Sequence, residues 1–185
     1  MIRLFIAFPL EQAVTDQLGR MITSLKQYGA DVKWVVPQNI HLTTCFLGDT
    51  DQSKVPAINK IIDEIGSQHS KVVTTISLVG GFPTLERARV IWAGMAEGGE
   101  QLGATTTALV GKVRRLGFTL DDKPFKPHLT LGRVREGGTM GELGTFLKSY
   151  SYDPIPVTFD RLTLFESTLT PQGPIYTGLH SGMLR

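Results

Sequence analysis

The tripeptide His-Leu-Thr occurs twice in this chain, and both copies lie at the same place in a repeated order of elements. The first copy begins at His41 and the second at His128. An apolar strand that begins at Arg3 precedes the first copy by 38 residues, and one that begins at Arg89 precedes the second by 39. In each half an amphipathic helix follows this strand, and a helix and a further strand follow His-Leu-Thr. The repeated order favours an internal duplication that produces two similar lobes.

The spacing of apolar residues predicts the individual elements. Apolar side chains recur every three or four positions in the segments 14–28, 55–65 and 102–116, which is the pattern of amphipathic helices, and a weaker helical pattern covers 143–147. Short apolar runs predict strands at 3–8, 32–36, 40–47, 72–82, 89–95, 128–134, 157–167 and 174–184. We therefore expect an α+β fold with two pseudo-symmetric lobes that share one sheet system. Its largely antiparallel sheets would face a central cleft, with the helices outside.

Length and composition limit the class of protein. A chain of 185 residues with 41% hydrophobic residues suits one globular domain, and no linker divides the halves, so we predict a single two-lobed domain spanning residues 1–185. No apolar run approaches the roughly 18 residues of a membrane helix, and the opening MIRLFIAFPLEQ becomes acidic too early for a signal peptide. Cys45 is the only cysteine, which excludes an internal disulfide and thiolate zinc sites. We expect a cytoplasmic monomer that binds no membrane.

Each His-Leu-Thr copy places an imidazole beside a hydroxyl. Side chains alternate between the two faces of a strand, so His41 shares a face with Thr43, and His128 shares a face with Thr130. A pair of imidazoles can supply a neutral general base and a protonated general acid, while hydroxyls donate to the non-bridging oxygens of a phosphate. The pattern predicts in-line hydrolysis at phosphorus. Because threonine is a poor metal ligand, we expect no metal or other cofactor.

Three further residues bear on the predicted site. Arg133 has a planar guanidinium that matches phosphate oxygens, but its odd offset from His128 places it on the apolar face unless Gly132 marks a bulge or a twist. Thr44 has the parity of that apolar back face, where its hydroxyl needs a hydrogen-bond partner. Cys45 has the parity of the cleft face and lines the cleft floor or, as the preferred interpretation, is an inert packed thiol.

The charge of the chain is mild overall and concentrated around the second copy. The formal net charge is +2. Between Lys112 and Arg135 seven basic residues stand against two aspartates, a local net charge of +5. A solvated charged surface is the ordinary interpretation of such a run, but its overlap with a His-Leu-Thr copy favours a role in binding anions.

In these residues the chain resembles the two-histidine phosphoesterase superfamily, and in particular the RNA 2′,3′-cyclic phosphodiesterases, also called 2′-5′ RNA ligases. The resemblance spans nearly the whole chain, from RLFIAF through VKWVVPQNIHLTTCFLGD and FKPHLTLGR to LFESTLTPQGPIY. The family signature is His-x-Thr-x in two copies, with x usually hydrophobic. The copy at His128 fits it fully, whereas the copy at His41 ends in Thr44 instead of a hydrophobic residue.

The resemblance implies a reaction and a set of roles. Its members open a 2′,3′-cyclic phosphate at an RNA end to leave a 2′-phosphate without a metal, and can run a reverse 2′-5′ joining reaction. By this resemblance His41 is the proton donor to the leaving 3′-oxygen, and His128 is the proton acceptor that activates water. The phosphate would be held by Thr43, Thr130 and Arg133.

Two alternatives stay open from the sequence. The first is a non-catalytic protein that binds RNA ends or nucleotides in the same cleft. The second keeps the enzyme but replaces RNA ends, such as those of tRNA fragments, with small cyclic nucleotides or an ADP-ribose cyclic phosphate. No RNA-recognition signature decides between them, and Phe125 and Trp34 are the candidates for stacking on a base.

Overall fold

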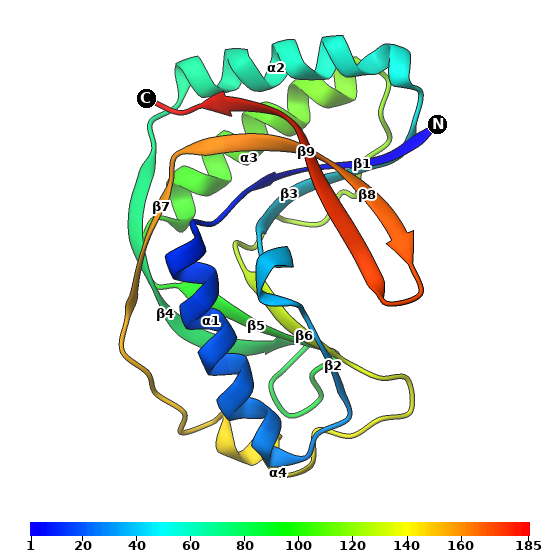
Figure 1. Cartoon of the computed structure of the whole chain (residues 1–185). Helices are drawn as coiled ribbons and strands as arrows, with labels where there is room; N and C mark the ends of the chain where they lie inside the picture. Colours follow the sequence, from blue (N-terminus) through cyan, green and yellow to red (C-terminus); the bar gives the residue numbers. More distant parts are fainter.

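The computed structural model describes residues 1–185 and has two antiparallel sheets with helices on their outer sides (Figure 1). One sheet has the order β3 (Leu42–Thr50), β1 (Ile2–Phe8), β8 (Arg161–Thr170) and β9 (Gly173–Met183). The other has the order β2 (Val32–Trp34), β6 (Leu129–Val134), β5 (Val90–Met95), β4 (Val72–Phe82) and β7 (Ile155–Phe159). We call the first sheet with its helices lobe A and the second lobe B. The predicted α+β class, the two lobes and the antiparallel pairing are confirmed.

Four α-helices and three short 3₁₀ turns complete the fold. The helices are α1 (Gln12–Leu25), α2 (Val55–Gln68), α3 (Gly99–Arg115) and α4 (Gly141–Phe146), and the 3₁₀ turns are η1 (Lys26–Tyr28), η2 (Pro37–Asn39) and η3 (Gln52–Lys54). Helix α2 packs on β8, β9 and α3 in lobe A, whereas α1 packs on β7 in lobe B. No helix combines the length and the apolar composition needed to cross a bilayer.

The expectation that the lobes share one sheet system is wrong, because the halves of the chain exchange strands between two separate sheets. β4, from the first half, pairs with β5 of the second, and β8, from the second half, pairs with β1 of the first. The orders β3-β1-β8 and β6-β5-β4 are therefore equivalent. The segment 157–167 is likewise two strands instead of one, because the chain leaves lobe B at Asp160 and enters lobe A at Arg161.

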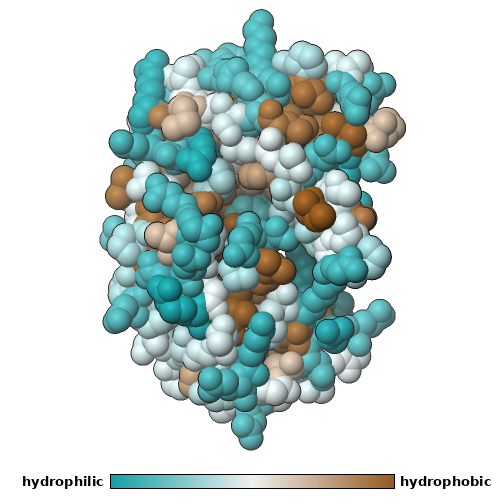
Figure 2. Space-filling model, viewed as in Figure 1, coloured by the Kyte–Doolittle hydropathy of each residue, from teal (hydrophilic) through white to brown (hydrophobic).

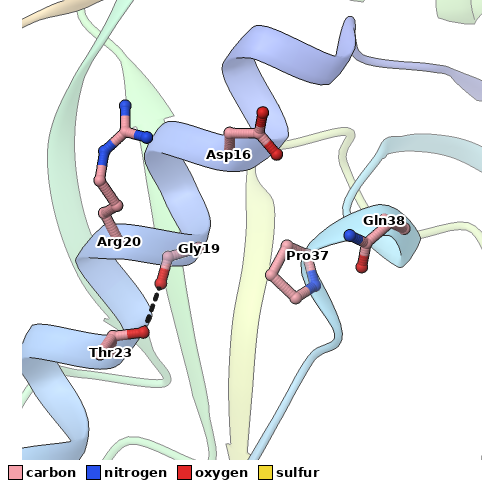
Figure 3. A pocket seen from close by; sticks show the side chains of 6 residues that line it. All are labelled: Asp16, Gly19, Arg20, Thr23, Pro37 and Gln38. Carbon is pink, nitrogen blue, oxygen red and sulfur yellow. Dashed lines mark hydrogen bonds between the residues drawn. The ribbon is translucent and has the colours of Figure 1, made fainter.

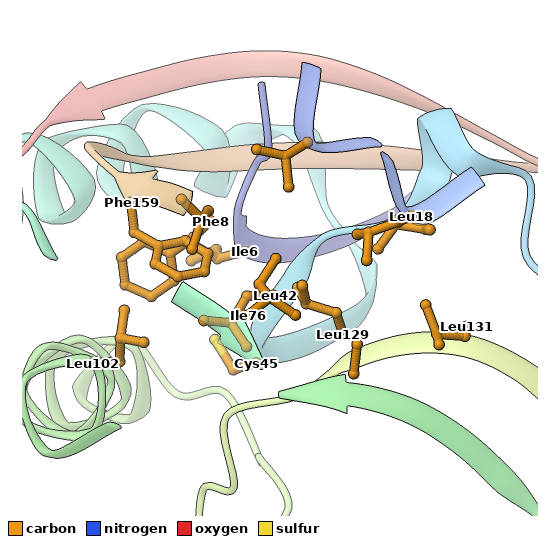
Figure 4. Close-up of a cluster of buried hydrophobic side chains, with 14 of the residues drawn as sticks. Ile6, Phe8, Leu18, Leu42, Cys45, Ile76, Leu102, Leu129, Leu131 and Phe159 are labelled. Atoms are coloured by element: carbon orange, nitrogen blue, oxygen red, sulfur yellow. The ribbon is translucent and has the colours of Figure 1, made fainter. Parts of the chain in front are cut away.

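One hydrophobic cluster extends through both lobes. Its members include the leucine of each His-Leu-Thr copy, Leu42 and Leu129, both without exposed surface (Figure 4). On β1 the side chains of Leu4, Ile6 and Phe8 join this cluster. The opposite face of β1 is therefore directed towards the cleft. The residue between histidine and threonine thus anchors each motif from behind.

Candidate active site

Both histidines stand immediately before a strand, one in each lobe. His41 precedes β3 in lobe A, and His128 precedes β6 in lobe B. His41 Nδ1 lies 2.7 Å from the carbonyl oxygen of Asn39, and His128 Nδ1 lies 2.6 Å from that of Lys126. A carbonyl only accepts, so Nδ1–H donates in both rings and the neutral ring carries its lone pair on Nε2. No sequence pattern indicates these bonds, because their acceptors are backbone carbonyls. They leave Nε2 of each ring free for proton transfer.

Each motif contains a β-bulge at the same position, three residues after the histidine. Thr43 pairs with Ala7 and Cys45 with Ile6, which leaves Thr44 as the extra residue of β3. In β6 the extra residue is Leu131, because its neighbours on either side pair with consecutive residues of β5. A bulge reverses the alternation of side chains beyond it. The fourth position of His-x-Thr-x is therefore the position that re-aims each strand.

The bulge in β3 bears on two expectations about the first motif. Cys45 pairs with Ile6 and joins the hydrophobic cluster, where burial raises the pKa of its thiol to about 11. This supports the preferred interpretation of an inert packed thiol, and Cys45 also borders the cavity between the lobes. Thr44 is a half-buried bulge residue and not a member of the apolar face. The predicted need for a hydrogen-bond partner is confirmed, since Thr44 Oγ1 donates to the carbonyl of Ile6 at 2.7 Å.

The bulge in β6 removes the parity objection to Arg133. Beyond Leu131 the strand resumes with Gly132 opposite Ile91 and Arg133 opposite Val90, which puts Arg133 on the face of Thr130. The equivalent position of the first motif holds Phe46, which is 64% exposed. Sequence reasoning missed Phe46 because simple alternation assigns it to the apolar face.

A cavity of about 560 Å³ lies between the lobes and brings the motifs together. Lobe A contributes Thr43, and lobe B contributes His128, Thr130 and Arg133. Thr106 of α3 also lines the cavity, and its buried hydroxyl has no hydrogen-bond partner. Figure 2 shows a largely hydrophilic face with apolar side chains near its middle, where the surface is hollowed. Of the five predicted site residues only His41 is outside this lining, two residues before Thr43.

His41 lies in an aromatic environment on the cleft face of lobe A. Its ring centre is 4.8 Å from that of Phe5 and 5.3 Å from that of Tyr176. Burial lowers the pKa of His41 to about 4, although the bond to the Asn39 carbonyl opposes this effect. The ring is therefore neutral at pH 7 in the free protein.

His128 has a more open environment on lobe B. Its ring meets the ring of Phe82 edge-on, with 5.0 Å between ring centres. Burial lowers its pKa, the Lys126 carbonyl opposes this, and the positive charge of Arg133 lowers it further. An anion that binds between His128 and Arg133 would offset that charge.

The comparisons with known proteins agree with this geometry. The family model of LigT-like phosphoesterases matches residues 8–92 and 96–176. The chain belongs to the LigT-like phosphoesterase family. The resemblance seen in the two His-Leu-Thr copies is confirmed.

Curated relatives and solved structures of this LigT-like phosphoesterase cover nearly its whole length. It is 34% identical to the RNA 2′,3′-cyclic phosphodiesterase of Archaeoglobus fulgidus, over 96% of this chain and 97% of the relative. It is 32% identical to that of Thermotoga maritima, over 96% and 93%. The fold is similar to E. coli LigT complexed with 3′-AMP, with a TM-score of 0.77 and 24% identity over 99% and 98% of the two chains.

In this LigT-like phosphoesterase the cavity lining includes four cations of the basic stretch 112–135, namely Arg114, Lys123, Lys126 and Arg133. Three cations of the stretch are in ion pairs, Lys112 with Glu64, Arg114 with Asp122 and Lys123 with Asp121. Lys126 and Arg133 line the cavity and belong to none of the six ion pairs. The charge available to an anion is therefore smaller and more local than the sequence indicates.

A second hollow of comparable size lacks such chemistry. It lies between α1 and η2, has a volume of about 480 Å³, and is lined by Asp16, Gly19, Arg20, Thr23, Pro37 and Gln38 (Figure 3). The Thr23 hydroxyl donates to the carbonyl of Gly19 within the helix, and no histidine or aromatic ring reaches the hollow. Its size alone gives it no catalytic role.

Proposed function

We propose that this chain hydrolyses the 2′,3′-cyclic phosphate at RNA ends to a 2′-phosphate, without a metal, through its two histidines. The observation that carries the proposal is the equivalence of the two motifs, which have the same bulge and the same Nδ1–carbonyl bond on opposite sides of one cleft. The names of the relatives in Archaeoglobus fulgidus and Thermotoga maritima support the substrate class. No three His, Cys, Asp or Glu side chains gather as metal ligands would.

The proposed reaction is an in-line displacement at phosphorus. His128 Nε2 takes a proton from a water molecule, whose oxygen forms the new bond to phosphorus. The bond from phosphorus to O3′ breaks, and His41 Nε2–H gives its proton to O3′. Hydrogen bonds from Thr43, Thr130 and Arg133 hold the non-bridging oxygens as negative charge develops on them. The same steps with a 5′-hydroxyl in place of water join two RNA ends through a 2′-5′ linkage.

The proton donor must be charged before the reaction, although His41 is neutral in the free protein at pH 7. We propose that the bound substrate supplies this charge, because an anionic phosphodiester beside the ring favours the imidazolium form. The Asn39 carbonyl acts in the same direction. Proton uptake by His41 is then coupled to substrate binding.

The direct test is the product formed from a short RNA that ends in a 2′,3′-cyclic phosphate. We expect a 2′-phosphate, identified by chromatography against authentic 2′- and 3′-phosphates, and an unchanged rate in excess EDTA. A 3′-phosphate product would mean that O2′ is the leaving group instead of O3′. Binding without hydrolysis would leave the chain as an RNA-end binding protein.

The pH dependence of catalysis should reflect the lowered pKa values of the free protein. Because kcat/KM reports the free enzyme, we expect a bell with an acidic limb near pH 4 and a basic limb below pH 6.5, whichever histidine has which role. Substrate raises both pKa values, so the profile of kcat should lie at higher pH. Both constants are measured from pH 4 to 8.5. A kcat/KM that rises through pH 7 would contradict the proposed pair.

The stability of the fold must be followed over the same pH range. An unfolded histidine titrates near 6.5, whereas His41 titrates at about 4 in the folded chain, so the unfolded state binds the proton first as pH falls. The stability due to neutral His41 is present above pH 6.5 and decreases by about 3 kcal/mol towards pH 4. Far-UV circular dichroism at each pH separates this loss from true titration of the active site.

A further inference from the structure

A smaller cavity continues the cleft face of lobe A beyond His41 towards the β8–β9 hairpin. It has a volume of about 150 Å³ and is distinct from the cavity between the lobes. Its lining includes Arg3, Phe5, Phe46, Ser167, Leu169 and Tyr176. Strand pairing places Phe5 beside Phe46 and Ser167 beside Tyr176, so these side chains form one continuous surface across four strands.

The two cavities share a lining residue, and His41 lines neither of them. Phe46 lines both of them. The His41 ring contacts Phe5 and Tyr176, which belong to the smaller cavity, while Thr43 of the same strand lines the larger one. A ligand whose phosphate lies at the histidines can therefore extend into the smaller cavity without leaving the surface of lobe A.

The chemistry of the smaller cavity combines a cation with exposed ring faces. Arg3 is exposed and belongs to none of the six ion pairs. Both Arg3 and Arg133 act on the Tyr176 phenol, where their charges oppose the rise in its pKa caused by burial. Arg3 and Tyr176 both line the smaller cavity. A free guanidinium beside aromatic rings is suited to a phosphodiester and its base, because the cation binds the phosphate while the base stacks on a ring.

We propose that this cavity binds the nucleotide that precedes the terminal one, with Arg3 on the phosphodiester between them and Phe46 or Tyr176 against its base. The inference rests on the proposed function and adds to it a preference for oligonucleotides over mononucleotides. A small cyclic nucleotide fills only the cavity between the lobes. An RNA end fills both.

The test compares two substrates, adenosine 2′,3′-cyclic phosphate and the dinucleotide ApA with a 2′,3′-cyclic phosphate end. For each, kcat/KM is measured with the native chain and with Arg3→Ala. We expect the ratio of dinucleotide to mononucleotide kcat/KM to fall about tenfold in Arg3→Ala, as for loss of a charge-assisted hydrogen bond at a partly solvated site. Arg3→Lys should retain part of the preference. Arg115→Ala, which removes an exposed charge outside both cavities, should leave the ratio unchanged.

A third substrate shows whether Arg3 acts on the internal phosphate. When a neutral methylphosphonate replaces that phosphodiester, the native chain should lose about tenfold in kcat/KM and Arg3→Ala should lose nothing further. An equal further loss in Arg3→Ala, or an unchanged substrate ratio, would overturn the inference and leave the proposed function intact. Failure of the native chain to hydrolyse either cyclic phosphate would overturn both.

Discussion

Replacing His128 with alanine should lower kcat/KM on a cyclic-phosphate RNA end by about 10²–10⁴, and replacing His41 should have a similar effect. Each change removes one proton-transfer group but leaves the threonines and Arg133 in the cavity. The matched control is His180→Ala, because His180 is bound to Asp63 at 2.7 Å and lines neither cavity. Steady-state kinetics and thermal unfolding of all three variants are compared. Undiminished turnover in the folded His128→Ala variant would refute the paired-histidine mechanism.

A change of leaving group separates the donor from the acceptor. A thiol is a much stronger acid than an alcohol, so sulfur in place of O3′ leaves without being protonated. On such a substrate His41→Ala should regain most of its lost rate, whereas His128→Ala should remain impaired. The opposite pattern would mean that His128 is the proton donor and His41 the proton acceptor, within the same active site.

Replacing Leu42 with alanine should lower the free energy of unfolding by about 2–5 kcal/mol. Leu42 has no exposed surface and lies within the cluster that extends through both lobes, so truncation leaves a cavity behind the first motif. Urea denaturation at pH 7.5 gives the change, with Leu169→Ala as the control because Leu169 is 68% exposed. A loss below about 0.5 kcal/mol would mean that the back face does not anchor the motif.

The sequence predicted the elements well and their partners poorly. Apolar periodicity identifies α1, α2 and α3 because each helix buries one face, and that information is local. The pairing of β1 with β8 joins segments at opposite ends of the chain, and no local pattern records it. The break between β7 and β8 falls at Asp160, where neither glycine nor proline marks a boundary.

The candidate site was predicted from four residues whose spacing along a strand determines which side chains share a face. Each histidine lies two residues before its threonine, His41 before Thr43 and His128 before Thr130. Both pairs precede the bulge, where the alternation of side chains still holds. Beyond the bulge the alternation of side chains fails, and with it the assignment of Phe46 to the apolar face. The bulge residues, Thr44 and Leu131, are chemically unlike, so no residue type signals the irregularity. The carbonyls that accept hydrogen bonds from the imidazoles belong to the backbone, so the side-chain sequence does not predict them.

The exchange of strands between the halves determines when the protein can fold during its synthesis. When both histidines have emerged from the ribosome, β8 and β9 have not yet emerged. At that stage β1 is an edge strand with no neighbour on one side. Sheets that pair distant segments have high contact order and form slowly. The first motif therefore acquires its complete supporting sheet only after β8 and β9 have been synthesised, and until then its aromatic surface is exposed to association with other nascent chains.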